Sequence, residues 1–184
     1  FGDCDNLRTV HIGDGVTYIG TYAFDSPLTA VYSYNKTPPT INNQNAFKAS
    51  TYSNATLYVP GPFFRRVYAA AQYWSNFTNV GIIHPYDFSY SGLYYCLYNR
   101  NYSDYDNPDQ CRVVHKDNNY NSYTSTSITI PSQAYYNGKY REVEAVGDYA
   151  FKNCTNLKSV TIPNTVKTIF HESFYGCTSL QTVV

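Results

Sequence analysis

The chain has 184 residues, and its 13 Lys and Arg residues balance its 13 Asp and Glu residues, so its formal net charge is zero. This balance argues against a nucleic-acid partner and against a polybasic attachment to a membrane surface, because both need clustered positive charge. The sequence contains no run of 18 apolar residues, so we expect no membrane insertion. With 22 tyrosines and only 14% charged residues, the surface should be neutral and rich in Tyr, Asn, Ser and Thr.

Phenylalanines recur every 23 residues near both ends of the chain, within a phrase of leucine, valine and isoleucine that keeps the same phase. This aromatic position is occupied by Phe1, Phe24, Phe47, Phe151 and Phe174. A fixed period in the twenties is typical of a repeat solenoid, in which each coil buries its apolar side chains only against neighbouring coils. We therefore predict that Phe24, Phe151 and Phe174 are buried at equivalent positions of stacked coils.

One coil can be followed along residues 160–169. Residues 160–162 (Val-Thr-Ile) alternate apolar and polar side chains, which predicts a short strand with the valine and the isoleucine directed inward. Pro163 marks a turn, and residues 166–169 should return along the other side of the coil with Ile169 inward. Stacked coils bring such strands side by side. The predicted fold is a mostly β repeat solenoid of short parallel strands, turns and short helical segments.

The first predicted domain spans residues 1–84. Residues 1 to about 60 should form the last coils of one array, and residues 61–77 should form a helix that closes it. The apolar positions of this helix fall on one face: Phe63, Val67, Ala70, Ala71 and Trp74. Because the end of a solenoid needs a cap, we expect this helix to cover the coil that contains Phe47 and to bury Trp74.

Residues 85–127 are predicted to form a small β module, with strands at 93–98 and 110–115 on either side of a polar loop. Cys96 and Cys111 flank this loop. A hairpin symmetric about the loop would bring the two thiols together, which allows either a disulfide or two separate free thiols. Three carboxylates of the loop, Asp104, Asp106 and Asp109, could offer oxygen ligands to calcium. Their spacing lacks the glycine and the distal glutamate of an EF-hand loop, so we expect a solvated acidic loop and no metal.

Residues 128–184 should begin a second array, whose first coil is lengthened by an insertion at 133–142. Phe1 opens the chain inside a coil and Val184 ends it inside a strand, so we expect a processed or excised piece of a longer protein. Both ends would leave an apolar face and unpaired backbone groups. Head-to-tail self-association of two copies through these ends is therefore a further expectation.

The wording of the repeat is specific: Ala150-Phe151-x-x-Cys154-x-x-Leu157-x-x-Val160-x-Ile162-Pro163. It resembles the BspA-type leucine-rich repeats of bacterial and protist surface proteins. Residues 57–60 with 68–77 look like the C-terminal cap of such an array, and residues 87–95 look like the strand module that opens a new one. The resemblance implies an extracellular or cell-surface location. It also implies adhesion to surface or matrix proteins of a host or a neighbouring cell.

The sequence predicts no enzyme. Its four histidines are scattered, no Ser/His/Asp set or metal-ligand spacing occurs, and we expect neither a catalytic site nor a cofactor. The candidate binding residues are the outward positions of the predicted strands: Thr9, His11, Tyr32, Thr129, Ser159 and Thr161. Protein binding is the favoured role of this surface. The alternatives are a glycan-binding module that uses exposed Tyr and Asn side chains, and a structural spacer.

Overall fold

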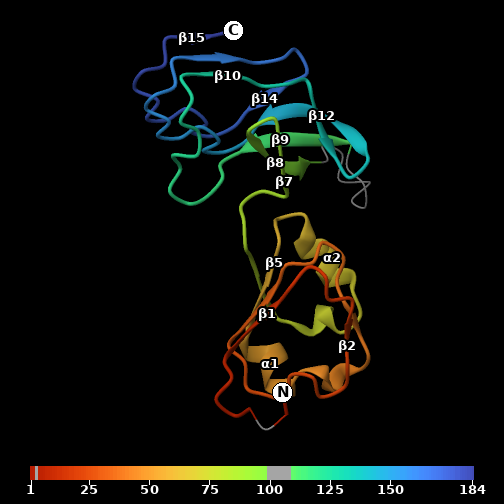
Figure 1. Cartoon of the computed structure of the whole chain (residues 1–184). Helices are drawn as coiled ribbons and strands as arrows, with labels where there is room; N and C mark the ends of the chain where they lie inside the picture. Colours follow the sequence, from red (N-terminus) through yellow and green to blue (C-terminus); the bar gives the residue numbers. More distant parts are fainter. Residues whose placement is uncertain (3, 99–108) are drawn as a thin grey trace. The chain divides into compact units, whose positions relative to one another are not determined.

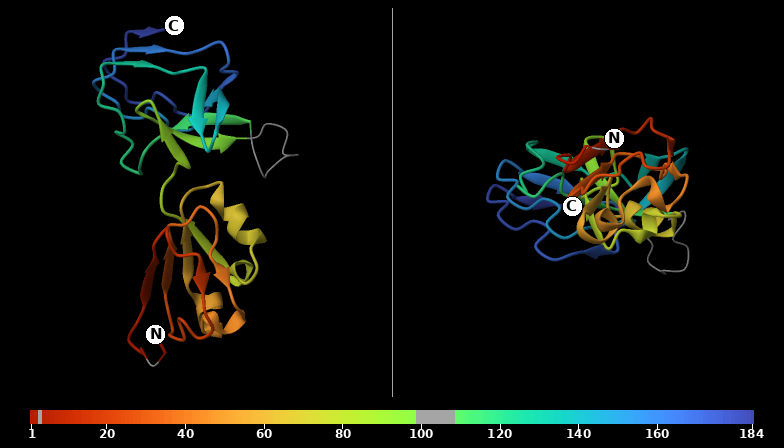
Figure 2. Two further views of the ribbon diagram at one scale, coloured as in Figure 1. Left: turned by 45° about the vertical axis from the view of Figure 1, so that its right-hand side comes forward. Right: turned by 90° about the horizontal axis from the view of Figure 1, so that it is seen from below.

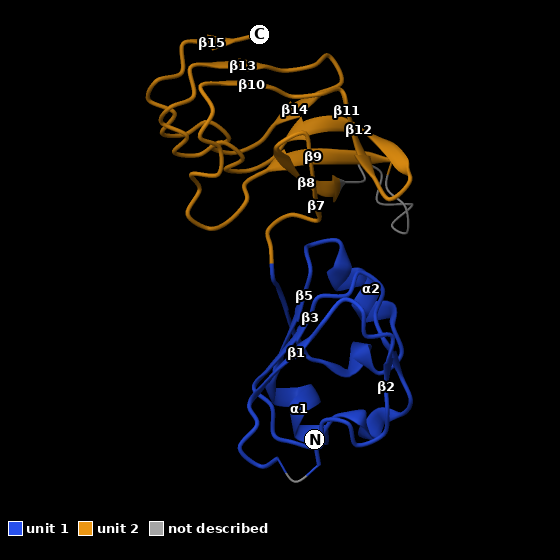
Figure 3. Cartoon of the chain, in the orientation of Figure 1, with its two compact units in different colours: residues 1–83 blue, residues 84–184 orange. Residues whose placement is uncertain are grey.

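The computed structural model describes residues 1–2, 4–98 and 109–184. The chain divides into two compact units, residues 1–83 (unit 1) and residues 84–184 (unit 2), each with its own hydrophobic core (Figures 1 and 3). Strands occur in both units, whereas the helical segments of the described residues all lie in unit 1. Within the described residues, no helix is long and apolar enough to cross a membrane.

Unit 1 is built on a parallel sheet with the strand order β1-β3-β5-β6. The strands are β1 (Thr9–Ile12), β3 (Ala30–Ser33), β5 (Thr56–Val59) and β6 (Asn79–Ile82), and they run side by side in Figure 2. A second parallel ladder joins β2 (Tyr18–Ile19) to β4 (Thr40–Ile41). Every neighbouring pair in both ladders is parallel, so the strands of successive repeats run in the same direction.

Apolar side chains align from strand to strand along the main sheet of unit 1. Val10, Val31, Leu57 and Val80 are register partners along the main sheet. The phenylalanine rings form a second row, since Phe1 stacks on Phe24 at 5.5 Å and Phe24 stacks on Phe47 at 5.3 Å between centroids. Phe47 is buried, but Phe24 is only half-buried, because the ring that covers its outer side, Phe1, is itself 69% exposed.

The predicted 61–77 helix is wrong in its extent. Unit 1 has two short helical segments before this region, η1 (Gln44–Ala46) and α1 (Ala49–Asn54). The helix itself spans only α2 (Phe64–Ala70), and a 3-10 turn, η2 (Trp74–Asn76), follows it. Tyr73 separates the two with a left-handed backbone (φ 66°), which an α-helix cannot contain.

The buried face of this segment also differs from the predicted one. Phe64 and Tyr68 are buried, whereas Phe63 and Val67 are half-buried and Ala70 is exposed. The face is therefore displaced by one residue along the helix. Trp74 is buried as expected, with 1% of its surface exposed, and its ring packs edge-on against Phe47 of the coil.

Unit 2 combines two sheets. One is mixed, in the order β11-β12-β9-β8-β7, with β14 beside β12. Its strands are β7 (Phe88–Tyr90), β8 (Leu93–Tyr98), β9 (Gln110–Val114), β11 (Gln133–Tyr136), β12 (Lys139–Val146) and β14 (Thr168–Ile169). The other is parallel and joins β10 (Ser127–Thr129), β13 (Ser159–Thr161) and β15 (Thr182–Val183).

The strands of residues 85–127 share a sheet and a core with the coils that follow them. β12 pairs with β9 in parallel, and the buried residues of the module, such as Phe88 and Val113, belong to one cluster with Phe151 and Val160. Phe151 is fully buried and stacks on the half-buried Phe174 at 5.1 Å. The inward placement of Ile169 was wrong, because this side chain is 52% exposed.

Candidate functional site

The outward face of the unit 1 sheet carries a stack of aromatic rings. His11 of β1, Tyr32 of β3 and Tyr58 of β5 are register partners on neighbouring strands. The ring centroids of His11 and Tyr32 lie 4.5 Å apart at 5°, and those of Tyr32 and Tyr58 lie 4.5 Å apart at 7°. Neighbouring strands are spaced about 4.8 Å apart, so equivalent positions of a parallel sheet hold flat rings at stacking distance. We call His11, Tyr32 and Tyr58 the aromatic strip.

Gly81 of β6 continues this row, as the register partner of Tyr58. A Cβ atom at Gly81 would lie 2.7 Å from both Cδ1 and Cε1 of Tyr58, so the tyrosine ring occupies the space above the glycine. The absent side chain of Gly81 therefore leaves room for the Tyr58 ring at the end of the aromatic strip.

Replacing Gly81 with alanine should displace the Tyr58 ring from its stack on Tyr32. We expect a loss of about 1–3 kcal/mol in the free energy of unfolding, the usual cost of overpacking a filled site. Near-ultraviolet circular dichroism should also change, because the tyrosine stack is disrupted. Gly13→Ala is the matched control, since nothing lies within 4 Å of a Cβ there. Equal stability and equal spectra for the two variants would contradict the proposed packing.

The outward face of the parallel sheet in unit 2 is a face of hydroxyl groups. Ser127, Ser159 and Thr182 form one row of register partners, and Thr129 with Thr161 forms the next. The Ser159 hydroxyl donates a hydrogen bond of 2.8 Å to the Ser127 hydroxyl. Within the described residues, these rows therefore carry hydroxyl groups where the aromatic strip of unit 1 carries rings.

The six candidate binding residues thus fall into two groups. Thr9, His11 and Tyr32 lie on the sheet of unit 1, and Thr129, Ser159 and Thr161 lie on that of unit 2. Sequence reasoning missed Tyr58, because residues 57–60 had been assigned to a cap. The alternation of Leu57, Tyr58 and Val59 is the signal that identifies its strand, with the tyrosine outward.

A disulfide between Cys96 and Cys111 is not present, since both are free, buried thiols. β8 and β9 pair in the antiparallel sense, but their register sets Cys96 opposite Arg112 and Leu97 opposite Cys111. Successive residues of a strand point to opposite faces of the sheet, so the two thiols point away from each other. Burial raises the pKa of the Cys111 thiol to about 12 and raises that of Cys96 as well. Both groups are therefore protonated and poor nucleophiles at neutral pH.

Of the three carboxylates considered for calcium, Asp104 and Asp106 lie outside the described residues. Asp109 is exposed and forms an ion pair with Lys139, which lowers the pKa of the aspartate. Across the parts of the chain that the structure describes, no three His, Cys, Asp or Glu side chains are grouped as metal ligands.

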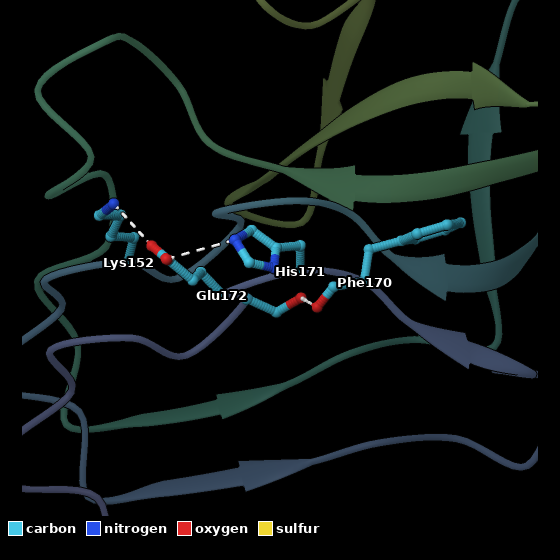
Figure 4. Close-up of polar contacts among 5 residues, drawn as sticks. Lys152, Phe170, His171 and Glu172 are labelled. Carbon is cyan, nitrogen blue, oxygen red and sulfur yellow. Dashed lines mark hydrogen bonds and ion pairs between the residues drawn. The ribbon is translucent and has the colours of Figure 1, made fainter.

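Unit 2 also contains a cluster of charged and aromatic side chains around the ammonium group of Lys152. Figure 4 shows this group directed at the carboxylate of Glu172, which also faces His171; the two nitrogen–oxygen distances are 2.9 and 3.2 Å. Two tyrosine rings, Tyr149 and Tyr175, lie 4.4 and 5.1 Å from the ammonium nitrogen. Lys152 and Glu172 belong to successive repeats, so the cluster ties one coil to the next.

The ion pair between Lys152 and Glu172 should make stability depend on acid pH. The hydrogen bond from Lys152 lowers the pKa of Glu172 below its ordinary value of 4.5. A carboxylate with a depressed folded pKa stabilises the fold above its unfolded pKa, and this contribution is lost as the pH falls through the folded value. In urea unfolding between pH 6 and pH 3, the stability difference between wild type and Glu172→Gln should shrink below about pH 4.5. A difference that stays constant over this range would show that the pair does not stabilise the fold.

One family of known proteins matches the repeat. The family model of the BspA-type leucine-rich repeat region matches six copies, over residues 1–61 and 139–184, which is more than half of the chain. Among solved structures, a leucine-rich cell surface protein from Faecalibacterium prausnitzii is similar at 21% identity with a TM-score of 0.36. That match covers 53% of this chain and 30% of the other. No curated protein matches. From the family match, the chain belongs to the BspA-type leucine-rich repeat family.

Proposed function

We propose that the chain is a non-enzymatic leucine-rich-repeat module, exposed at a cell surface or secreted, that binds proteins through the outward strand face of unit 1. In this proposal the stacked coils form a solenoid whose strand face is offered to a large partner. The partner is a surface or matrix protein of a host or a neighbouring cell. Membership of a family of repeat surface proteins supports this role, and the single observation that carries it is the aromatic strip.

The aromatic strip has the properties of a protein-binding surface. Each of its rings is held by its neighbours at stacking distance, so little side-chain entropy remains to be lost on binding. Tyrosine supplies a large contact area with a polar tip, and for this reason it is enriched where proteins meet. The zero net charge of the chain also fits a partner recognised by shape and hydrogen bonds.

The same geometry argues against glycan binding at the aromatic strip. A sugar stacks on a free aromatic face, but Tyr32 has His11 on one face and Tyr58 on the other. For Tyr32, the ring edge and the hydroxyl group are what remains for a partner. Such edges suit the mixed polar and apolar surface of a protein better than the flat face of a pyranose ring.

The proposal can be tested with fluorescently labelled chain and a panel of bacterial and animal cells, measured by flow cytometry. We expect binding to at least one cell type, and loss of that binding when surface proteins are first removed with protease. Tyr32→Ala and Tyr58→Ala should weaken binding at least tenfold, as expected for central tyrosines of an interface. Tyr135→Ala is the control, because Tyr135 is a 46% exposed tyrosine of unit 2.

Two results would overturn the proposal. Binding that survives protease but is lost after glycosidase treatment would identify a glycan partner instead. Absence of binding to every cell type and to immobilised matrix proteins would favour a structural spacer.

A further inference from the structure

Unit 1 contains a groove of about 610 Å³ beside the aromatic strip. It lies between two successive turns, one that follows β1 and one that follows β3. Its wall includes Tyr34, whose hydroxyl is hydrogen-bonded to Nδ1 of His11 at 3.0 Å. The volume is in the range of small-molecule binding sites.

Hydrogen bonds from buried side chains fix the backbone that lines the groove. The buried Tyr68 donates a hydrogen bond of 2.9 Å to the carbonyl of Asn35, and the buried Trp74 donates one of 2.7 Å to the carbonyl of Pro39. The side-chain amide of Asn35 in turn donates to the carbonyl of Gly13 at 2.8 Å and so links the two turns. A ligand would therefore meet a groove that is already formed, which reduces the cost of ordering it.

The chemistry of the groove is neutral, rich in hydroxyl groups and aromatic on one side. Thr17, Thr37 and Thr40 line it and are exposed. Asp14 and Lys36 contribute one negative and one positive charge, which leaves the lining without net charge. Tyr34 is 40% exposed, and its ring lies alongside only one other aromatic ring among the described residues, that of His11 at 6.0 Å.

We propose that this groove binds a neutral oligosaccharide. The apolar C–H face of a pyranose ring would pack on Tyr34, and the sugar hydroxyls would exchange hydrogen bonds with the threonine hydroxyls and the Asp14 carboxylate. A charged ligand is disfavoured, since the lining carries opposite charges that cancel. The groove differs from the aromatic strip in offering an exposed tyrosine that is not enclosed between two rings. The proposal is independent of protein binding by the aromatic strip, because it concerns other residues and another class of ligand.

The test uses the whole chain and three neutral tetrasaccharide probes, made of glucose, of N-acetylglucosamine and of N-acetyllactosamine units. Each is titrated to millimolar concentration while amide shifts are followed by two-dimensional NMR. We expect at least one probe to shift the amides of residues 14–17 and 34–40 in a saturable manner. Tyr34→Ala should weaken this binding about tenfold, in line with the loss of a stacking partner. Tyr34→Phe keeps the ring and should retain binding.

Controls separate the groove from the rest of the surface. Tyr135→Ala should bind as the wild type does, and Thr37→Val, which removes a hydroxyl at nearly constant volume, should bind more weakly. The proposal is overturned if no probe shifts these amides, if the shifts map elsewhere, or if Tyr34→Ala binds as tightly as the wild type. Saturable binding in the groove of a proline-rich peptide but of none of the sugars would also overturn it. None of these outcomes depends on whether the chain binds cells through the aromatic strip.

Discussion

Replacing Phe151 with alanine should lower the free energy of unfolding of unit 2 by about 3–5 kcal/mol, the usual cost of truncating a buried phenylalanine. The ring is fully buried, stacks on Phe174 at 5.1 Å and lies 5.0 Å from the ring of Tyr123. It therefore joins the repeat of Phe174 to the segment between β9 and β10, and its removal would leave a cavity bounded by both. Urea unfolding followed by far-ultraviolet circular dichroism measures the loss.

Two variants calibrate this expectation. Phe174→Ala should cost less than Phe151→Ala, because Phe174 occupies the same repeat position but is only half-buried. Tyr135→Ala should change stability by no more than about 0.5 kcal/mol, as is usual for exposed positions, since this ring is 46% exposed and lies in the insertion. Equal losses at Phe151 and Phe174 would show that burial in the stack does not determine the energy.

The alignment of the phenylalanines could be predicted from the sequence, because equal spacing places them at the same position of successive repeats. The phenylalanine stack of Phe1, Phe24 and Phe47 follows from the 23-residue period. The pairing of Val10 with Val31 does not, because these two residues are 21 positions apart and are aligned by the register of β1 with β3. The period does not report how deeply each ring is buried. Burial depends on what covers the coil from outside, and for Phe24 that cover is a single exposed ring.

The helical segment at residues 61–77 of unit 1 was harder to predict. The apolar pattern of residues 61–77 fits one continuous helix, but the left-handed backbone at Tyr73 divides it. This break lets Trp74 turn inward and donate its hydrogen bond to Pro39. A tertiary contact of this kind has no local signal in the sequence and overrides the helical pattern.

Some residues of the candidate site could be predicted from the sequence and others could not. Strand alternation predicts that His11 and Tyr32 point outward; in the structure His11 is exposed and Tyr32 is half-buried. Tyr58 joins this row through the register of β5 with β3, and Gly81 joins it through the register of β6 with β5. Register also determines whether Cys96 and Cys111 can meet. The pairing of β8 with β9 differs by one residue from the one that would set the two cysteines opposite each other, so they lie on opposite faces of the sheet.

Replacing Trp74 with alanine should be the most damaging single change in unit 1, at a cost of about 3–5 kcal/mol for the lost ring. The indole is 1% exposed and packs against Phe47, Tyr68 and Phe77. Its N–H satisfies the carbonyl of Pro39, so truncation also leaves a buried acceptor without its partner, which adds about 1–3 kcal/mol. Because the chain has a single tryptophan, unfolding of the variant must be followed by circular dichroism rather than by fluorescence.

Trp74→Phe separates the two contributions, because it keeps most of the apolar ring and removes the donor. We expect an intermediate loss of stability, together with weaker ordering of the turn at residues 34–40 in amide hydrogen exchange, since that turn loses its anchor. Exchange in β12 and β13 of unit 2 should be unchanged, because the indole packs within the core of unit 1. If Trp74→Phe were as stable as the wild type and equally protected at residues 34–40, the hydrogen bond to Pro39 would have no structural role. If Trp74→Ala destabilised both units together, their unfolding would be coupled and the assignment of Trp74 to the core of unit 1 alone would be wrong.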